Sequence, residues 1–295
     1  MRPRRQAVLP ALALFSALSL ALTGCGAGAA TDAEVAAVST DNGIRVGQCY
    51  LISTPEEYGA SSHTGPAVAC AEPHTTQTFL VATVPQPLSE QTERPLHEQL
   101  QNLTARLCPA AELRRYLGGT ERDATTGMAI TGYYPTRADW SAGSRTVRCD
   151  VLTTTADMAP RESRGDLKDA LAGPGSAPIR LCYVQEIKDG VLGSEGTDTS
   201  CSEPHTTEDV SAWFGQDASL VPLAAQQERC LPFVLDFLNV DVLPADVEVR
   251  PIVRVDGGAR AVRCGVAPRQ PAGPERWTGT LAPVAGTVSG EVANG

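Results

Sequence analysis

The residues best suited to chemistry lie in a seven-residue motif that occurs twice in the chain. Residues 70–76 are Cys-Ala-Glu-Pro-His-Thr-Thr, and residues 201–207 are Cys-Ser-Glu-Pro-His-Thr-Thr. An imidazole has an unperturbed pKa of about 6.5, so His74 or His205 could serve as a general base. The Cys-x₃-His spacing could also supply two ligands to a zinc ion. The motif therefore offers two chemical options, acid–base catalysis and metal binding.

The rest of the sequence gives these histidines no catalytic companion. It contains no Gly-x-Ser-x-Gly nucleophile elbow, no Gly-Lys-Ser/Thr phosphate loop and no His-Glu-x-x-His zinc helix. Proline fixes the backbone of a turn, and His and Thr side chains hydrogen-bond nearby amides. We therefore expect the motif to build a turn, and we assign no catalytic residue. Partner binding is the main alternative, and its candidate residues in the two motifs are Glu72, His74, Glu203 and His205.

The first 25 residues indicate export and attachment to a membrane. Three arginines among the first five residues precede an apolar run over 7–22, and Leu-Thr-Gly-Cys follows, ending at Cys25. This order is typical of a signal peptide. The ending resembles the lipobox of bacterial lipoproteins, which implies that residues 1–24 are removed and that Cys25 carries an acyl lipid such as palmitate. Two acyl chains hold a protein durably on a bilayer, so we expect it on the extracytoplasmic face of the cell membrane. An ordinary cleaved signal peptide is the alternative.

The cysteines follow a repeated order that predicts disulfides. Apart from Cys25 they form two sets of four around the motifs, namely Cys49, Cys70, Cys108 and Cys149, then Cys182, Cys201, Cys230 and Cys264. Even numbers in an exported chain favour disulfides, and no Cys-x₂-Cys pair is present, so we expect neither a metal nor a cofactor. Four cysteines allow three pairings per set. We favour first with second and third with fourth, which would tie neighbouring strands together and join a helix to the last strand.

Composition argues against one class of partner. The chain carries 24 Lys+Arg and 34 Asp+Glu, a formal net charge of −10, and loss of the signal-peptide arginines makes the mature protein more acidic. Nucleic acid is a polyanion that requires a cationic surface, so we expect no nucleic-acid partner. The same acidity disfavours electrostatic attachment to anionic lipid. The lipid on Cys25 must therefore hold the protein at the membrane. The expected partner is an envelope protein or the cell wall.

Hydrophobic patterns predict the same order of elements around both motifs. Leu96, Leu100, Leu103 and Leu107 recur every three or four residues, which predicts a helix that ends near Cys108. Runs rich in β-branched and aromatic residues predict strands. The predicted strands lie at 46–53, within 67–84, at 128–134 and 146–153, then at 181–187, 210–214, 247–255 and 261–266, with a second helix at 230–240.

These patterns predict an α+β fold of two tandem, small, disulfide-stapled domains, each a short antiparallel sheet with one main helix. The predicted segments are a signal peptide at 1–24, a tether at 25–42, a first repeat at 43–155, a linker at 156–178, a second repeat at 179–267 and a disordered tail at 268–295. Tether, linker and tail are assigned from small, polar, Gly- and Pro-rich composition.

An aromatic group in the first repeat is a further binding candidate. Trp140 lies in a predicted loop after Tyr133 and Tyr134. Such rings can stack on a sugar or a peptide, or they can complete a small core. We keep Trp140 as a candidate binding residue, with the core role as the simpler alternative.

The combined pattern resembles the septum formation domain of exported and membrane-anchored actinobacterial proteins. That pattern is Gly-x-Cys, Cys-x-Glu-Pro-His, Cys, Trp-x-x-Gly and a final Cys. The first set matches it in order, with Gly47, Trp140 and Gly143 at the added positions, whereas the second set has Val255 in place of the tryptophan. The resemblance covers both sets as two tandem copies. It implies a role at the cell envelope, near the division septum, but no particular reaction.

We therefore predict a membrane-anchored binding or scaffold module of the cell envelope, not an enzyme, with a link to septum formation. Duplication favours binding because two linked modules raise avidity through effective concentration. The alternative is an envelope hydrolase or accessory enzyme that uses the Glu-Pro-His residues. A pocket that unites His74 with a second titratable group would support the enzyme, and a histidine packed against its own turn would not.

Overall fold

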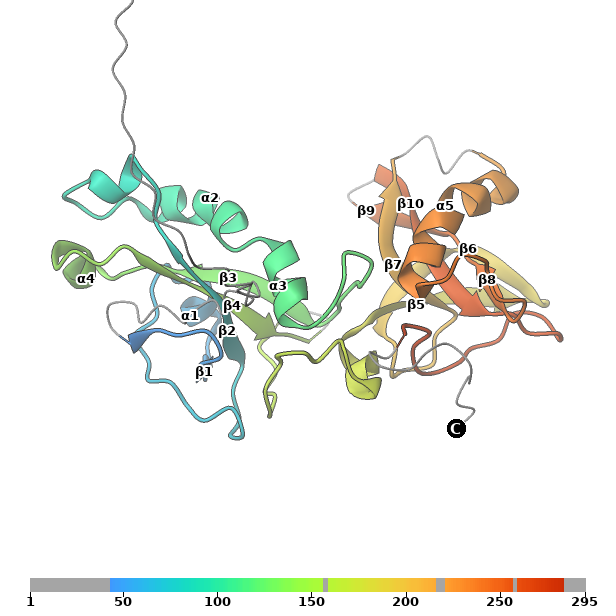
Figure 1. Ribbon diagram of the computed structural model, residues 1–295, viewed down its shortest axis with the longest axis horizontal. Coiled ribbons are helices and arrows are strands. Elements are labelled where there is room, and N and C mark those ends of the chain that lie inside the picture. Colours follow the sequence, from blue (N-terminus) through green and yellow to red (C-terminus); the bar gives the residue numbers. More distant parts are fainter. Residues whose placement is uncertain (1–42, 156–158, 216–220, 257–258, 284–295) are drawn as a thin grey trace, which may run out of the picture. The chain divides into compact units, whose positions relative to one another are not determined.

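Two β-sheets organise the protein in the computed structural model (Figure 1). The structure describes residues 43–155, 159–215, 221–256 and 259–283, which all belong to one compact unit, Ala37–Gly295. The fold is mixed α and β, as predicted, but two tandem domains are not confirmed as separate units. The predicted signal peptide, the predicted tether and Cys25 lie outside the described residues. No helix among the described residues is both long and apolar enough to cross a membrane.

The N-terminal half, residues 43–172, contains a four-stranded antiparallel sheet in the order β1-β2-β4-β3. Its strands are β1 (Cys49–Tyr50), β2 (Thr76–Thr83), β3 (Met128–Tyr133) and β4 (Thr146–Thr153). Strand β4 is buried along its whole length because it lies between β2 and β3. Its alternate residues Val147 and Val151 join the main core of this half, as the two-residue period of a strand requires.

Two consecutive helices pack on this sheet, so the single main helix predicted here is not confirmed. They are α2 (His97–Leu107) and α3 (Ala110–Tyr116), which contact β2, β3 and β4 (Figure 1). Helix α2 ends before Cys108 because the proline that follows disfavours a helical conformation in the preceding residue. Pro109 then caps α3. The shorter helical segments are α1 (Pro55–Gly59), η2 (Leu88–Glu90) and α4 (Arg137–Ser141).

The C-terminal half, residues 173–283, closes into a five-stranded barrel. Its strand order is β7-β5-β6-β9-β10, β10 pairs back onto β7, and β8 is added beside β10. The elements are η3 (Pro174–Ile179), β5 (Leu181–Lys188), β6 (Val191–Ser200), β7 (Thr207–Phe214), α5 (Leu223–Leu238), β8 (Val247–Val249), β9 (Ile252–Asp256) and β10 (Ala259–Pro268). Helix α5 packs on β7, β8 and β10. The sequence predicts a short antiparallel sheet for this half; the structure instead closes the sheet into a barrel, with one parallel pair between β6 and β9.

Strand β6 closes the barrel, and the sequence did not predict it. Its residues are mostly polar or Gly, without the apolar alternation that predicts a strand. It forms because it pairs with β5 through a hairpin that turns at Asp189 and Gly190. Both residues have positive φ, as tight two-residue hairpins require. On its other side β6 pairs with β9 in parallel, and this pairing completes the barrel.

The four disulfides join the cysteine pairs that the sequence favours. Cys49–Cys70 and Cys182–Cys201 tie the first strand of each half to its motif. Cys108–Cys149 joins the end of α2 to β4, and Cys230–Cys264 joins α5 to β10. Each loop closure restricts the unfolded chain and contributes roughly 3 kcal/mol to stability. Helix and sheet are therefore held together covalently in both halves.

At one matched cross-strand position, the two halves carry the acidic residue on opposite strands. In the first, Thr78 of β2 lies opposite Asp150 of β4 and donates to its carboxylate over 2.8 Å. In the second, Asp209 of β7 lies opposite Gly265 of β10. A Cβ on Gly265 would lie 2.3 Å from Thr207 Cγ2 and 2.9 Å from two backbone oxygens. Because β10 has no room for a side chain there, the carboxylate of this pair comes from the opposite strand.

This close packing predicts that Gly265→Ala destabilises the protein. We expect the free energy of unfolding to fall by about 1–3 kcal/mol, the usual cost of overpacking, as measured by denaturant unfolding with the disulfides intact. Gly173→Ala is the matched control, because a Cβ at that position meets nothing within 4 Å. Equal stability of the two variants would show that the packing at Gly265 is not as tight as described.

Candidate functional site

Each motif forms a turn that encloses its histidine. The side chains of His74 and His205 are 0% exposed. The Nδ1 atom of His74 lies 2.9 Å from the Glu72 carbonyl oxygen, and that of His205 lies 2.7 Å from the Glu203 carbonyl oxygen. A carbonyl oxygen only accepts hydrogen bonds, so Nδ1 carries the hydrogen in both rings. Each imidazole is thus packed against its own turn, as the turn interpretation predicts.

A downstream segment lies across each turn and pairs with the histidine backbone. We call residues 163–167 the first strap and residues 277–281 the second strap. His74 and Ser163 exchange two backbone hydrogen bonds of 3.1 and 2.8 Å, and His205 and Trp277 exchange two of 2.9 and 2.8 Å. Two residues farther along, a glycine N–H of each strap donates to the carbonyl oxygen of the first motif cysteine over 2.7 Å. The two straps therefore close their turns in the same way.

The residue that follows each motif fastens the far end of its strap. The Gln77 side chain accepts from the Leu167 N–H over 2.8 Å and donates to Asp166 over 2.7 Å. Glu208, at the matching position, accepts from the Leu281 N–H over 2.6 Å and from the Thr280 hydroxyl over 2.5 Å.

The straps correct two sequence assignments. The first strap lies in the predicted linker at 156–178 and the second in the predicted disordered tail at 268–295. The described part of that tail, residues 268–283, is ordered because its backbone pairs with the motif turn. Residues 284–295 lie outside the described part of the chain.

The disulfides occupy the sulfur atoms that a metal would need. Among the described residues, one group of candidate ligands has its ligand atoms within 4.8 Å of one another: Cys182, Cys201 and His205. Cys182 and Cys201 are bonded to each other, and a disulfide sulfur lacks the thiolate charge that binds zinc. The arrangement is therefore a covalent staple beside a buried imidazole. Burial lowers the pKa of His205.

The motif residues and Trp140 do not form one site. Glu72 and Glu203 are exposed on their turns, whereas Trp140 is 1% exposed within the core of the N-terminal half. Its ring nitrogen donates to the Gln91 carbonyl oxygen over 2.9 Å, and the Arg145 guanidinium lies 3.8 Å from a ring centroid. Trp140 therefore has the core role, and the structure leaves it no surface for a ligand.

A cluster around Arg148 was missed by sequence reasoning. The buried guanidinium lies 3.6 Å from the Tyr50 ring centroid and 4.8 Å from that of Tyr133. Its Nε lies 3.0 Å from the fully buried Asp150 carboxylate, and its Nη2 donates to His63 Nδ1 over 3.1 Å. Burial, followed by the charge of Arg148, lowers the pKa of His63. The adjoining hollow is about 50 Å³, which is room for water rather than for a substrate.

The C-terminal half has a matching trio without the histidine. The Tyr183 hydroxyl donates to Asp209 over 2.7 Å, and Arg263 Nε donates to the same carboxylate oxygen over 3.0 Å. The signal for both clusters is the Cys-Tyr pair that opens each cysteine set and the Arg-Cys pair that ends it. Sequence reasoning could find those pairs but not the carboxylate, because it comes from different strands in the two halves.

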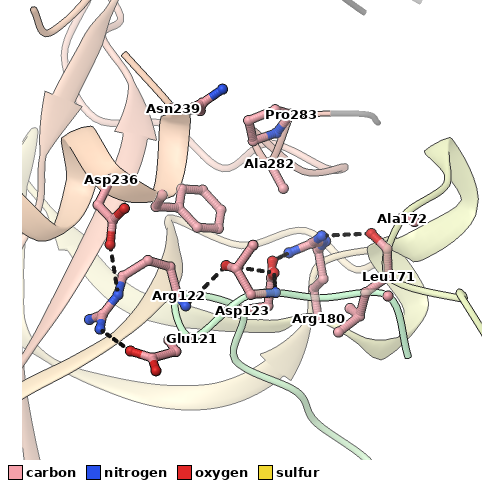
Figure 2. A pocket seen from close by; sticks show the side chains of 13 residues that line it. Glu121, Arg122, Asp123, Leu171, Ala172, Arg180, Asp236, Asn239, Ala282 and Pro283 are labelled. Atoms are coloured by element: carbon pink, nitrogen blue, oxygen red, sulfur yellow. Dashed lines mark hydrogen bonds and ion pairs between the residues drawn. The ribbon is translucent and has the colours of Figure 1, made fainter. Parts of the chain in front are cut away.

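A larger hollow lies beside the end of α5 (Figure 2). Its volume is about 590 Å³, and its lining includes Phe237 of α5 and neither motif histidine. Its charged groups face one another in pairs. Arg122 Nε lies 3.1 Å from the Asp236 carboxylate, and Arg180 is paired with Asp123. The side chains of Arg122 and Arg180 that line the hollow are thus both held in ion pairs.

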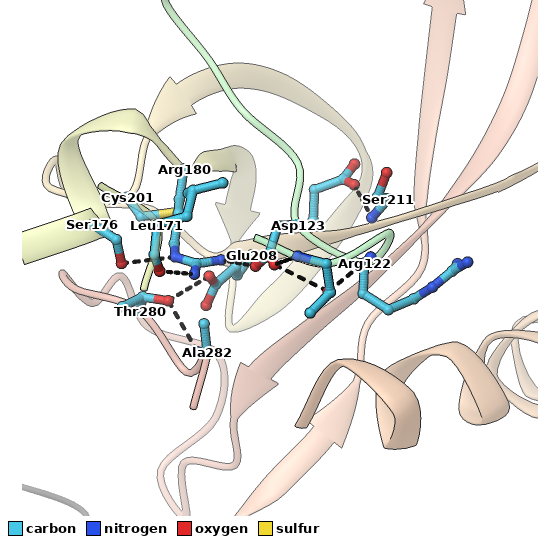
Figure 3. A network of polar contacts seen from close by, with 12 residues as sticks. Arg122, Asp123, Leu171, Ser176, Arg180, Cys201, Glu208, Ser211, Thr280 and Ala282 are labelled. Carbon is cyan, nitrogen blue, oxygen red and sulfur yellow. Dashed lines mark hydrogen bonds and ion pairs between the residues drawn. The ribbon is translucent and has the colours of Figure 1, made fainter. Parts of the chain in front are cut away.

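Arg180 ties together several segments behind this hollow (Figure 3). The side chain is buried, and each of its nitrogens is used. Nε donates to the Ser176 hydroxyl and Nη2 to the Leu171 carbonyl oxygen, both over 2.9 Å, while Nη1 donates to Asp123. Removal of one member would leave a buried charge without its partner, which is costly. This network therefore fixes the loop that carries Asp123 to the start of β5.

Glu208 extends the same network into the second strap (Figure 3). Burial raises its pKa to about 7, against the opposing charge of Arg180 and the hydrogen bonds from Thr280 and Leu281. Asp123 adds a smaller upward shift. The carboxyl group that holds the second strap is thus protonated in the folded protein at mildly acidic pH.

Comparison with known proteins identifies one family. A family model described as septum formation matches residues 46–239 in a single span, more than half of the chain. The span contains both motifs and the first strap but ends before β8, and it does not divide into two copies. Neither the curated proteins nor the solved structures include a match.

The raised pKa of Glu208 predicts a pH-dependent stability. Between about 4.5 and 7, the folded protein keeps a proton on Glu208 that the unfolded chain releases, so stability falls as pH rises through this window. We expect Glu208→Gln, which copies the Gln77 side chain, to remove a part of this dependence on the order of 3 kcal/mol. Denaturant unfolding at pH 4.5 and pH 7.5 measures it. The exposed carboxyl variant Glu203→Gln is the control, and a Glu208→Gln profile parallel to wild type would contradict the assignment.

Proposed function

The chain belongs to the septum formation family, and from this premise we propose that it is a lipid-anchored binding module for septum formation on the outer face of the cell membrane. In this proposal residues 1–24 are a removed signal peptide, Cys25 carries the lipid, and two copies of one domain follow the tether. The protein is of the actinobacterial lipoprotein type. It engages an envelope protein or the cell wall.

The observation that carries the proposal is the burial of both motif imidazoles. A general base must come within hydrogen-bond reach of the proton that it removes. His74 and His205 are enclosed by their turns and straps, so a substrate would reach either ring only if a strap were displaced. Binding at the surface requires no such displacement. We therefore favour recognition over the alternative of an envelope hydrolase.

Two further features support the proposed location and mode of action. Four disulfides are typical of proteins that fold outside the cytoplasm. The net charge of −10 disfavours attachment to an anionic bilayer through basic side chains, so a covalent lipid is the better means of attachment. Two similar modules on one tether would also raise avidity for a partner that is itself repeated along the envelope.

Imaging tests this proposal. A fusion of the full chain to a fluorescent protein that matures outside the cytoplasm is expected to concentrate at septa in dividing cells. Cys25→Ala is expected to abolish labelling by an alkyne fatty acid and to disperse the signal, because the anchor is lost. A fusion of residues 1–42 alone is the control, and we expect it to label the whole periphery. A uniform peripheral signal from the full-length fusion would contradict the septal role.

A further inference from the structure

A loop of the N-terminal half carries His63 onto the sheet. We call residues 60–66 the histidine loop, which follows α1 and precedes the first motif. The Ser61 carbonyl oxygen accepts from the Tyr134 N–H over 2.8 Å, and Arg94 Nη2 donates to the Ser61 hydroxyl over 2.7 Å. The C-terminal half has β6 in the corresponding place between its first strand and its motif. The loop and its histidine are therefore specific to the N-terminal half.

The half-buried imidazole is held by the sheet on one edge and by its own loop on another. Its centroid lies 5.7 Å from that of the Tyr50 ring and 5.6 Å from that of the Tyr133 ring. Its Nδ1 atom lies 3.1 Å from Arg148 Nη2. A Cβ on Gly65 would lie 2.7 Å from His63 Cε1 and Nε2, so the loop backbone lies against that edge of the ring. We therefore expect the ring to leave the sheet only when the loop moves with it.

Arg148 determines the protonation state of this ring. A guanidinium only donates hydrogen bonds, so Nδ1 accepts and the neutral ring carries its hydrogen on Nε2. A proton on Nδ1 would remove the acceptor and would place a second positive charge beside Arg148. Burial, followed by the charge of Arg148, lowers the pKa of His63. The closed loop thus disfavours the imidazolium.

The remaining ionisable groups do not reverse this preference. They reach the cluster from several elements, as Tyr50, Glu57, Tyr133, Tyr134, Asp139 and Asp150. Glu57 raises the pKa of His63, but its effect is smaller than those of burial and Arg148. Asp150 is paired with Arg148, and Asp139 accepts from the Thr136 hydroxyl over 2.6 Å. Burial raises the pKa of all three tyrosines, which are therefore neutral at acidic pH.

We propose that protonation of His63 releases the histidine loop from the sheet, so that the loop opens in acid. In the open form the ring is solvated and takes up a proton with the ordinary imidazole pKa of about 6.5, whereas the closed form resists that proton. Because the open form binds more protons, the open fraction rises as the pH falls below about 6.5. Opening also exposes the Arg148 guanidinium. The inference goes beyond the proposed function and does not depend on a septal role.

Hydrogen exchange of the Tyr134 amide tests the proposal, because this amide donates to the loop at Ser61. The Val84 amide is the internal reference, since it donates to the Arg145 carbonyl oxygen in the same half. Nuclear magnetic resonance of the isotope-labelled chain gives both protection factors at pH 7.5 and pH 5.0. In the wild type we expect the ratio of Tyr134 to Val84 protection to fall about threefold or more between these pH values.

Two variants show whether His63 causes this change. In His63→Asn the new amide oxygen can accept from Arg148 but does not titrate, so the ratio should be the same at both pH values. His97→Asn is the matched control, because His97 is exposed on α2, and it should keep the wild-type fall. A constant ratio in the wild type, an undiminished fall in His63→Asn, or titration of His63 without a change at Tyr134 would overturn the proposal.

Discussion

The structure depends on the backbone pairing between each Glu-Pro-His turn and the strap that crosses it. The histidine ring closes the turn through Nδ1, and its backbone N–H and carbonyl oxygen pair with Ser163 or Trp277. The disulfide next to the turn joins it to the first strand of its half. The residues that first suggest catalysis or metal binding are thus used to enclose a turn.

The two halves use different residues at matching positions to hold the strap and to pair with an arginine. Gln77 holds the first strap and Glu208 the second. In each half an arginine precedes the last cysteine, and the carboxylate beside it comes from Asp150 in one half and Asp209 in the other. Of the two exchanges, only that of Gln77 for Glu208 adds a buried ionisable group, and the charge of Arg180 acts on that carboxyl group. The C-terminal half has the additional strand β6, which closes the barrel and contributes to the lining of a hollow of about 600 Å³.

The sequence best predicts those elements that are determined by a local pattern of residues. The cysteine order indicates the disulfide pairs, the leucine spacing indicates α2, and β4 has a clear β-rich pattern. Strand β6 and both straps could not be predicted, because polar and Gly-rich segments become ordered only when a distant backbone supplies their hydrogen-bond partners. The same limit applies to Asp150 and Asp209, whose role appears only when strand register is known. Trp140 shows that a residue type alone does not separate a core from a binding surface.

The central claim is that each histidine turn holds its strap in place through backbone hydrogen bonds. Hydrogen exchange at the straps tests this claim most directly. In the wild-type protein we predict slow exchange of the Trp277 and Gly279 amides, which donate to His205 and Cys201. In His205→Ala these two amides should exchange faster, while those of Ser163 and Gly165 in the other half stay protected. Fast exchange of the Trp277 and Gly279 amides in the wild type, or no change in the variant, would contradict the account.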